Sequence, residues 1–306
     1  MKTKNNTIMV ILAYLIMIII WSTTPLAIKW SSSGVDFITA LSARMLIGTT
    51  IAVALSLLFH KSIPLHKKAL QVYFASSFSI YGAMMLVYYG AQFISSGLVS
   101  VIFGTTTMFT SWFAIQFFAS EKFCITKLLG ALFGIAGLSY IYIEQMHMGE
   151  QALIGILSIL AAVIIHSMSA VWIKHIDIKL PALSITAGSL SISLPVFLLT
   201  FWLFAQPLPN EIPTRTLWSI IYLGIMGSVV GFSSYYYALA NLKASTVALT
   251  TLITPITALL LGNIFNNELI TSHIWLGTTL IITGLFIYQL KQSFAFPLLK
   301  RSKESI

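Results

Sequence analysis

The sequence predicts an all-α integral membrane protein with ten transmembrane helices, arranged as two inverted five-helix repeats with both termini in the cytoplasm. Three observations predict it: the composition, the distribution of basic residues between loops, and an internal repeat. Of the 306 residues, 58% are hydrophobic and 8% are charged, whereas ordinary globular domains carry about 25% charged residues. This balance excludes a water-soluble domain of this length.

Ten apolar stretches follow one another along the chain. A bilayer core about 30 Å thick needs about 20 mostly apolar residues per helix, and each stretch is close to that length. The first apolar run continues to Trp21 with no small-residue cleavage site behind it, so we interpret it as a retained helix and not a signal peptide. The ten stretches are 7–30, 37–59, 69–91, 96–119, 126–143, 153–173, 182–205, 216–239, 245–266 and 274–290.

Basic residues gather in alternate loops. Only Lys29 and Arg215 fall on the side opposite the N-terminus, and Arg44 lies within the second span. Because positive loops stay inside, we expect a multi-pass protein of a bacterial cytoplasmic (inner) membrane with a basic cytoplasmic tail over 291–306. The same bias explains the net charge of +9 without a nucleic-acid partner. The fourteen residues on the N-terminal side are Lys2, Lys4, Lys61, Lys67, Lys68, Lys122, Lys127, Lys174, Lys179, Lys243, Lys291, Lys300, Arg301 and Lys303.

The two halves of the chain resemble each other. An offset of 147 residues places residues 88–91 on 235–238 and Glu121 on Glu268. At an offset of 145, residues 28–29 fall on 173–174. The repeat predicts one five-helix unit over 1–147 and a second over 148–290.

An odd number of spans in each unit means that the second unit enters the membrane from the opposite side. Inverted repeats of this kind typically hold a substrate near the midplane, at their interface, and permit alternating access from the two sides. The repeat therefore predicts a secondary transporter for a small-molecule solute, surrounded by membrane lipids.

Several segments in a fixed order carry a family resemblance: residues 21–29, Arg44, residues 88–91, and residues 244–268 followed by Gly277 and Gly284. With these segments the chain resembles the EamA-type transporters of the drug/metabolite transporter superfamily. The resemblance implies ten helices, a central cavity and export of metabolites, such as amino acids, or of drugs.

One departure from repeat symmetry concerns a proline. The fourth span carries Met108 where the ninth carries Pro255. Proline removes a backbone hydrogen bond and can kink its helix, so we interpret the ninth span as a candidate moving element.

Arg44 is the one basic residue deep in a predicted span. Ionisable residues within the membrane usually face a cavity or a partner. Its guanidinium has two interpretations: it binds a carboxylate or phosphate of the substrate, or it holds helix ends together at the outer gate. Lys29 also has two interpretations. It takes part in gating, or its side chain simply reaches the water at the outer surface.

Aromatic residues in several spans are the second candidate group. Aromatic walls with a few hydrogen-bond donors suit an amphipathic solute, and the alternatives are an interfacial belt or ordinary packing. His166 lies within the sixth span, where it either titrates during transport or packs as a neutral side chain. The candidate cavity residues are Trp21, Arg44, Tyr81, Met85, Tyr88, Trp112, His166, Trp172, Phe232, Tyr235 and Tyr236.

Small residues in the fifth and tenth spans predict close helix packing outside the cavity. They are Gly130, Gly134, Gly277 and Gly284, with Gly137 as a further site. A homodimer contact at these helices is a second possibility.

The sequence lacks the motifs that several kinds of chemistry require. No Asp or Glu lies in the middle of a predicted span, and no phosphate-binding loop is present. We therefore expect no cofactor, no metal and no enzymatic activity, and transport driven by a solute gradient, by exchange, or by coupling through His166 or a helix-end acid. A lipid or lysolipid flippase and a membrane sensor without transport are the alternatives.

Overall fold

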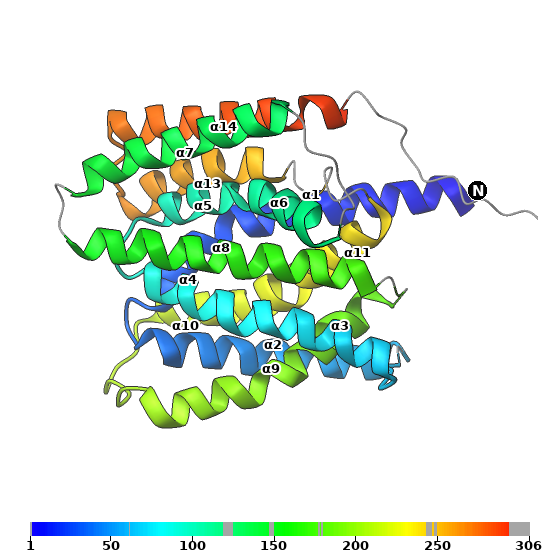
Figure 1. Ribbon diagram of the computed structural model, residues 1–306. Helices are drawn as coiled ribbons and strands as arrows, with labels where there is room; N and C mark the ends of the chain where they lie inside the picture. The colour runs from blue at the N-terminus through cyan, green and yellow to red at the C-terminus, as the bar shows by residue number, and fades with distance from the viewer. Residues whose placement is uncertain are drawn as a thin grey trace, which may run out of the picture.

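The computed structural model is a bundle of helices that run beside one another (Figure 1). It describes residues 2–60, 62–118, 125–146, 150–176, 178, 180–242, 247 and 250–293. All regular structure in these residues is helical. The first residues of α1 and the last residues of α14 lie at the same end of the bundle (Figure 1).

The helices of the first half follow the predicted spans closely. They are α1 (Lys2–Ser31), α2 (Phe37–Leu58), α3 (Lys67–Phe78), η1 (Ser79–Ala83), α4 (Met84–Gly90), α5 (Ser96–Gly104), α6 (Thr106–Phe118) and α7 (Ile125–Met146). The second half contains α8 (Glu150–Ile176), α9 (Ala182–Phe204), α10 (Thr214–Tyr222), η2 (Leu223–Gly231), α11 (Phe232–Asn241), α13 (Thr250–Asn266) and α14 (Ser272–Ser293).

Seven continuous helical segments within the described residues are long and apolar enough to cross a membrane. Three further apolar helices are shorter, over Ile125–Ile141, Thr250–Asn266 and Ser272–Tyr288. The predicted all-helical membrane architecture is thus confirmed. The seven spans are Ile8–Ser31, Phe37–Leu58, Lys67–Gly90, Ser96–Phe117, Gln151–Ile176, Ala182–Phe204 and Thr214–Asn241.

Local chemistry explains where several helices begin. The carboxylate of Asp36 accepts hydrogen bonds from the backbone N–H groups of Ile38 and Thr39 at the start of α2. The hydroxyl of Ser95 accepts one from Leu98 N–H at the start of α5. Such caps satisfy backbone donors that have no partner within the helix. Pro255 does not end its helix, because α13 continues through it to Asn266.

Two spans change from α- to π-helical geometry near their middle. The segment η1 separates α3 from α4, and η2 separates α10 from α11. With the offset of 147, residues 79–83 fall on 226–230, which lie inside η2. Short π-helical segments are rare and are often found at functional sites. The sequence pattern had given no sign of them.

Helix packing is the same when the two halves are exchanged. Equivalent helices pair as α2 with α9 and as α7 with α14, while α5 packs on α13. The contacts of α3 and η1 with α9 are matched by those of α10 and η2 with α2, and the contact of α6 with α8 by that of α13 with α1. Likewise α4 packs on α8 as α11 packs on α1. The described helices of the two halves therefore have similar sets of neighbours.

The predicted glycines lie where α7 meets α14. A Cβ atom on Gly130 would lie 2.5 Å from the carbonyl oxygen of Gly284, and one on Gly137 would lie 2.5 Å from that of Gly277. Only glycine allows the two backbones to approach so closely. These four residues therefore contact one another within one chain. Gly134 instead faces the side chain of Met108, whose Cε would be 2.6 Å from an added Cβ.

Candidate functional site

Aromatic rings from four helices meet inside the bundle. Trp21 of α1, Phe103 of α5, His166 of α8 and Tyr235 of α11 form what we call the central aromatic cluster. The ring centroids of Trp21 and Tyr235 are 5.3 Å apart, and those of His166 and Tyr235 are 6.0 Å apart. Phe103 lies 6.1 Å from His166. These distances are those of aromatic rings in direct contact.

Two members of this cluster are equivalent in the repeat. With the offset of 145, Trp21 falls on His166, and their ring centroids are 6.4 Å apart in an edge-to-face arrangement. The cluster therefore forms where corresponding helices of the two halves approach each other. His166 Nδ1 also lies 3.0 Å from the hydroxyl of Ser79, the first residue of η1.

Arg44 is buried beside the second π-helical segment, with 1% of its surface exposed. Its Nε donates a hydrogen bond to the hydroxyl of Ser228 in η2 at 3.0 Å. Its Nη1 donates to the hydroxyl of Tyr88 at 3.5 Å. Both acceptors are neutral, and among the described residues no carboxylate pairs with the guanidinium. A buried charge without an opposite charge is costly.

The second π-helical segment connects Arg44 with the central aromatic cluster. Ser228 contacts the guanidinium, and three residues later a Cβ atom on Gly231 would lie 3.7 Å from the indole nitrogen of Trp21. Tyr235 follows one turn further on and contacts the Trp21 ring. One helix face thus runs from the cation to the rings.

Other predicted residues surround these groups. Tyr236 and Phe232 continue the aromatic contacts of Tyr235, with centroids 5.2 Å apart for Tyr235 and Tyr236. Tyr81, in η1, shares a hydrogen bond of 2.7 Å with the hydroxyl of Thr200 and packs on Phe197. Met85 is partly buried against the same core.

Two predicted tryptophans lie elsewhere. Trp112 is 54% exposed and packs on Phe113 and Phe117 of its own helix. Trp172 packs edge-to-face on the exposed ring of Phe74. Neither has a described ring contact with the central aromatic cluster.

Sequence reasoning missed several contributors. Ser228 and Phe103 were not among the predicted site residues, and neither was Ser79. The repeat offset of 147 places Ser228 on the predicted cavity residue Tyr81, which is a signal that could have pointed to this position. Phe103 falls on Thr250, so the repeat gives no comparable sign for it.

A polar cluster, which we call the end network, joins helices at the end of the bundle opposite the start of α1. Lys29 Nζ donates a hydrogen bond to the carbonyl of Ile94 at 2.6 Å. The Glu268 carboxylate accepts hydrogen bonds from the Ser96 hydroxyl at 2.8 Å and from Gly97 N–H at 3.3 Å. Glu268 therefore caps the N-terminus of α5, where a negative charge is favoured.

Further contacts extend the end network to α10. Trp30 Nε1 donates to the Asn266 side chain at 2.9 Å, and Asn266 donates to Glu268 at 2.9 Å. The Arg215 guanidinium lies 3.7 Å from the centre of the Trp30 ring and donates to the carbonyl of Phe265. The network thus ties α1, α5, α10 and the end of α13 together.

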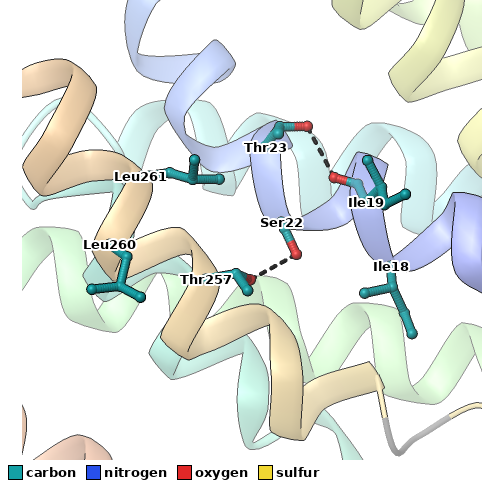
Figure 2. Close-up of a pocket in the computed structure, with 7 residues that line it drawn as sticks. All are labelled: Ile18, Ile19, Ser22, Thr23, Thr257, Leu260 and Leu261. Carbon is teal, nitrogen blue, oxygen red and sulfur yellow. Dashed lines mark hydrogen bonds between the residues drawn. The ribbon is translucent and has the colours of Figure 1, made fainter.

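A groove with a volume of about 360 Å³ lies between α1 and α13 (Figure 2). Its walls are mainly aliphatic, and its polar groups include the hydroxyls of Ser22 and Thr257, which share a hydrogen bond of 2.7 Å. Ile19 on its rim is exposed at the side of the bundle. The lining residues are Ile18, Ile19, Ser22, Thr23, Thr257, Leu260 and Leu261.

Metal ligation has no support in the described part of the chain. No group of three or more His, Cys, Asp or Glu side chains there is placed to hold a metal ion. The acid Glu121, which the repeat pairs with Glu268, lies outside the described residues.

Long apolar helices around a buried cation and an aromatic interior define a multi-pass membrane protein. A model of the EamA-like transporter family matches residues 8–143 and again residues 153–289. The chain belongs to this family, and it is therefore a membrane transporter of the drug/metabolite type. The predicted resemblance is confirmed.

Similar proteins are themselves described only as transporters. The chain is 28% identical over 286 residues to the uncharacterized transporter YoaV of Bacillus subtilis, covering 91% of this chain and 96% of that protein. It is 24% identical to the uncharacterized transporter YdfC of the same species, covering 94% and 93%. A protein of known crystal structure superposes with a TM-score of 0.68 at 18% identity, covering 92% of this chain and 97% of that one. That likeness shows the fold.

Proposed function

We propose that the protein is a secondary transporter that exports small organic metabolites or drugs by alternating access, with the solute at the central aromatic cluster. The observation that carries the proposal is the meeting of Trp21 and His166, equivalent residues of the two halves, at the centre of the bundle. Rocking one half against the other changes the solvent access of such a position while leaving it between the halves.

The proposed topology has ten spans in two inverted units, with both termini in the cytoplasm of a bacterial cell. The exchange-symmetric helix packing supports the inverted units. The common location of the first and last described helix ends supports an even number of crossings (Figure 1). The excess of basic residues on the N-terminal side supports the orientation.

In this topology the end network lies on the outer side and acts as the outer gate. Opening to the outside requires breaking the hydrogen bond from Lys29 to Ile94 and the contacts of Glu268 with the start of α5. The network therefore supports a conformation that is closed to the outside. The α7 and α14 pair, locked by glycine contacts, serves as scaffold.

The driving force comes from a gradient or from exchange. The chain has no phosphate-binding loop, and its acids lie outside the middle of the spans. Coupling through His166 or Glu268 is part of the proposal. A homodimer, if formed, uses surfaces other than the four glycines that contact one another within the chain.

A lipid or lysolipid flippase is the second candidate, and the groove between α1 and α13 favours it. Its aliphatic walls and exposed rim suit an acyl chain entering from the side. Its paired hydroxyls offer little to hold a charged headgroup, and the central aromatic cluster is left without a role in that mechanism.

The two candidates are separated by one preparation of the purified protein in proteoliposomes. Counterflow of labelled amino acids and of a cationic dye is measured beside the movement of a labelled lysolipid between leaflets. Saturable solute counterflow without lysolipid movement supports the export proposal. Lysolipid movement without any solute counterflow supports the flippase.

A further inference from the structure

The Arg44 guanidinium and the central aromatic cluster point to one class of substrate. We infer that the site binds an organic monoanion, with its carboxylate at Arg44 and an aromatic or apolar body against Trp21, His166 and Tyr235. The inference rests on the proposed transport function and names the substrate class of that same site.

The first observation is the charge of the Arg44 guanidinium. A guanidinium stays protonated in proteins and carries five N–H donors. Arg44 makes two hydrogen bonds, one of them as long as 3.5 Å, so three donors remain without a hydrogen bond to a described residue. Ser228 and Tyr88 are neutral acceptors, so within the part of the chain that the structure describes no opposite charge compensates the buried guanidinium. A carboxylate supplies the missing charge and accepts two parallel hydrogen bonds from a guanidinium.

The second observation concerns the space beside the Arg44 guanidinium. The residue beside Nη2 is Gly227, and a Cβ atom there would lie 3.2 Å from that nitrogen. Any larger residue would crowd it, so the glycine keeps this nitrogen free of a covering side chain. The Nη2 donors therefore lie next to the backbone of Gly227, with the side chain of Leu223 nearby.

The third observation is the distance between Arg44 and the central aromatic cluster. Ser228, which contacts Arg44, and Tyr235, which contacts Trp21, are seven residues apart on one continuous helical segment. At no more than about 1.5 Å per residue, because the stretch begins in the π-helical η2, their Cα atoms lie at most about 10 Å apart along the helix axis. A carboxylate joined to a ring by a short aliphatic linker spans the gap between the guanidinium and the rings.

A monoanion fits better than a phosphate monoester. One guanidinium balances one negative charge, and phosphate groups carry about −1.5 to −2 at neutral pH. The next basic residues of the described outer half, Lys29 and Arg215, are held by backbone carbonyls in the end network. Arg44 therefore acts alone on the ligand's charge.

The experiment compares three probes with the same ring on the purified protein: 3-phenylpropionate, its neutral amide 3-phenylpropionamide, and phenyl phosphate. Thermal unfolding in detergent reports binding, because a ligand of the native state raises the midpoint. We expect 3-phenylpropionate to raise the midpoint, and the other two probes to bind at least about tenfold more weakly, which corresponds to about 1.4 kcal/mol, and so to raise it less. Equal stabilisation by the amide, or a stronger effect of phenyl phosphate, overturns the inference.

Substitutions test whether the response to 3-phenylpropionate depends on Arg44. Arg44→Gln should abolish the response to 3-phenylpropionate, and Arg44→Lys should keep a weakened response because the charge remains. Lys68→Gln removes an exposed cation outside the site and the end network and should leave the response unchanged. Where Arg44→Gln does not fold, Tyr88→Phe keeps the cation and should preserve the preference for the carboxylate over the amide. Loss of that preference in Tyr88→Phe, or a full response in Arg44→Gln, contradicts the inference.

Counterflow in proteoliposomes separates this inference from the proposed function. Arg44-dependent binding of 3-phenylpropionate without counterflow of any solute overturns the transport proposal and leaves the anion site standing. Counterflow of the cationic dye with no preference for the carboxylate overturns the anion site and leaves transport standing.

Discussion

Gly130 packs on Gly284 as Gly137 packs on Gly277, so that each glycine of α7 contacts the repeat equivalent of the other. This reciprocity is what a two-fold relation between two halves requires. It joins α7 and α14 into one closely packed pair.

A bulky residue at this contact should destabilise the protein. Leucine in Gly137→Leu would push its side chain into the backbone of α14, where a Cβ atom alone lies 2.5 Å from Gly277 O. Overpacking of this kind costs about 1 to 3 kcal/mol. The matched control is Ala136→Leu, because Ala136 is the exposed neighbour on the same helix. Thermal unfolding in detergent should show a lower midpoint for Gly137→Leu alone, and equal midpoints would disprove the tight contact.

Removing the hydroxyl of Ser228 should also destabilise the protein. Ser228→Ala leaves Arg44 Nε without its acceptor at 3.0 Å, and an unsatisfied buried donor costs about 1 to 3 kcal/mol. Ser158→Ala is the control, since that hydroxyl is exposed and bonds only to the carbonyl of Ile154 in its own helix. The midpoint of thermal unfolding should fall for Ser228→Ala and stay unchanged for Ser158→Ala. Unchanged stability in both would mean that Arg44 finds another acceptor.

Weakening the end network should open the outer side more often. Glu268→Gln removes the negative charge that caps α5, and we expect a loss of about 1 to 2 kcal/mol from the closed state. A reporter cysteine at Trp21, made as Trp21→Cys with the single native cysteine removed by Cys124→Ser, is labelled with an impermeant thiol reagent from outside. Labelling should accelerate about tenfold, which corresponds to about 1.4 kcal/mol.

Glu211→Gln is the control for this measurement, because Glu211 is an exposed acid in the loop between α9 and α10. Its labelling rate should match that of the parent protein. Acceleration by both substitutions would point to a general charge effect, and acceleration by neither would contradict the role of the end network as a gate.

Sequence composition and periodicity predicted the helical membrane class, and the small residues predicted close packing of the helices that carry them, because these depend on residue type along one helix. Which side chains of neighbouring helices face each other depends on how the helices pack. Trp112 and Trp172 satisfied the aromatic pattern as well as Trp21 did, yet they lie away from the central cluster. The repeat paired Glu268 with Glu121 but gave no sign that Glu268 caps α5.

The π-helical segments explain another part of what the sequence did not predict. Expecting regular helices places residues after position 79 or 223 on the wrong face, because a π-helical turn shifts the register of everything that follows. Ser228 lies within such a segment, and its contact with Arg44 depends on that shifted register. The aromatic motif at 235–238 was recognisable, and Trp21 and His166 were predicted cavity residues, but the sequence did not predict that both rings contact Tyr235.

Counterflow of a labelled solute in proteoliposomes, comparing Trp21→Ala with Trp112→Ala, tests the central claim most directly. Both substitutions remove one indole, but Trp21 lies in the central aromatic cluster and Trp112 is exposed on α6. The account predicts saturable counterflow in the parent protein, a loss of about tenfold or more in Trp21→Ala, and near-parental counterflow in Trp112→Ala. Parental counterflow in Trp21→Ala, or an equal loss in both variants, would contradict a solute path through the centre of the bundle.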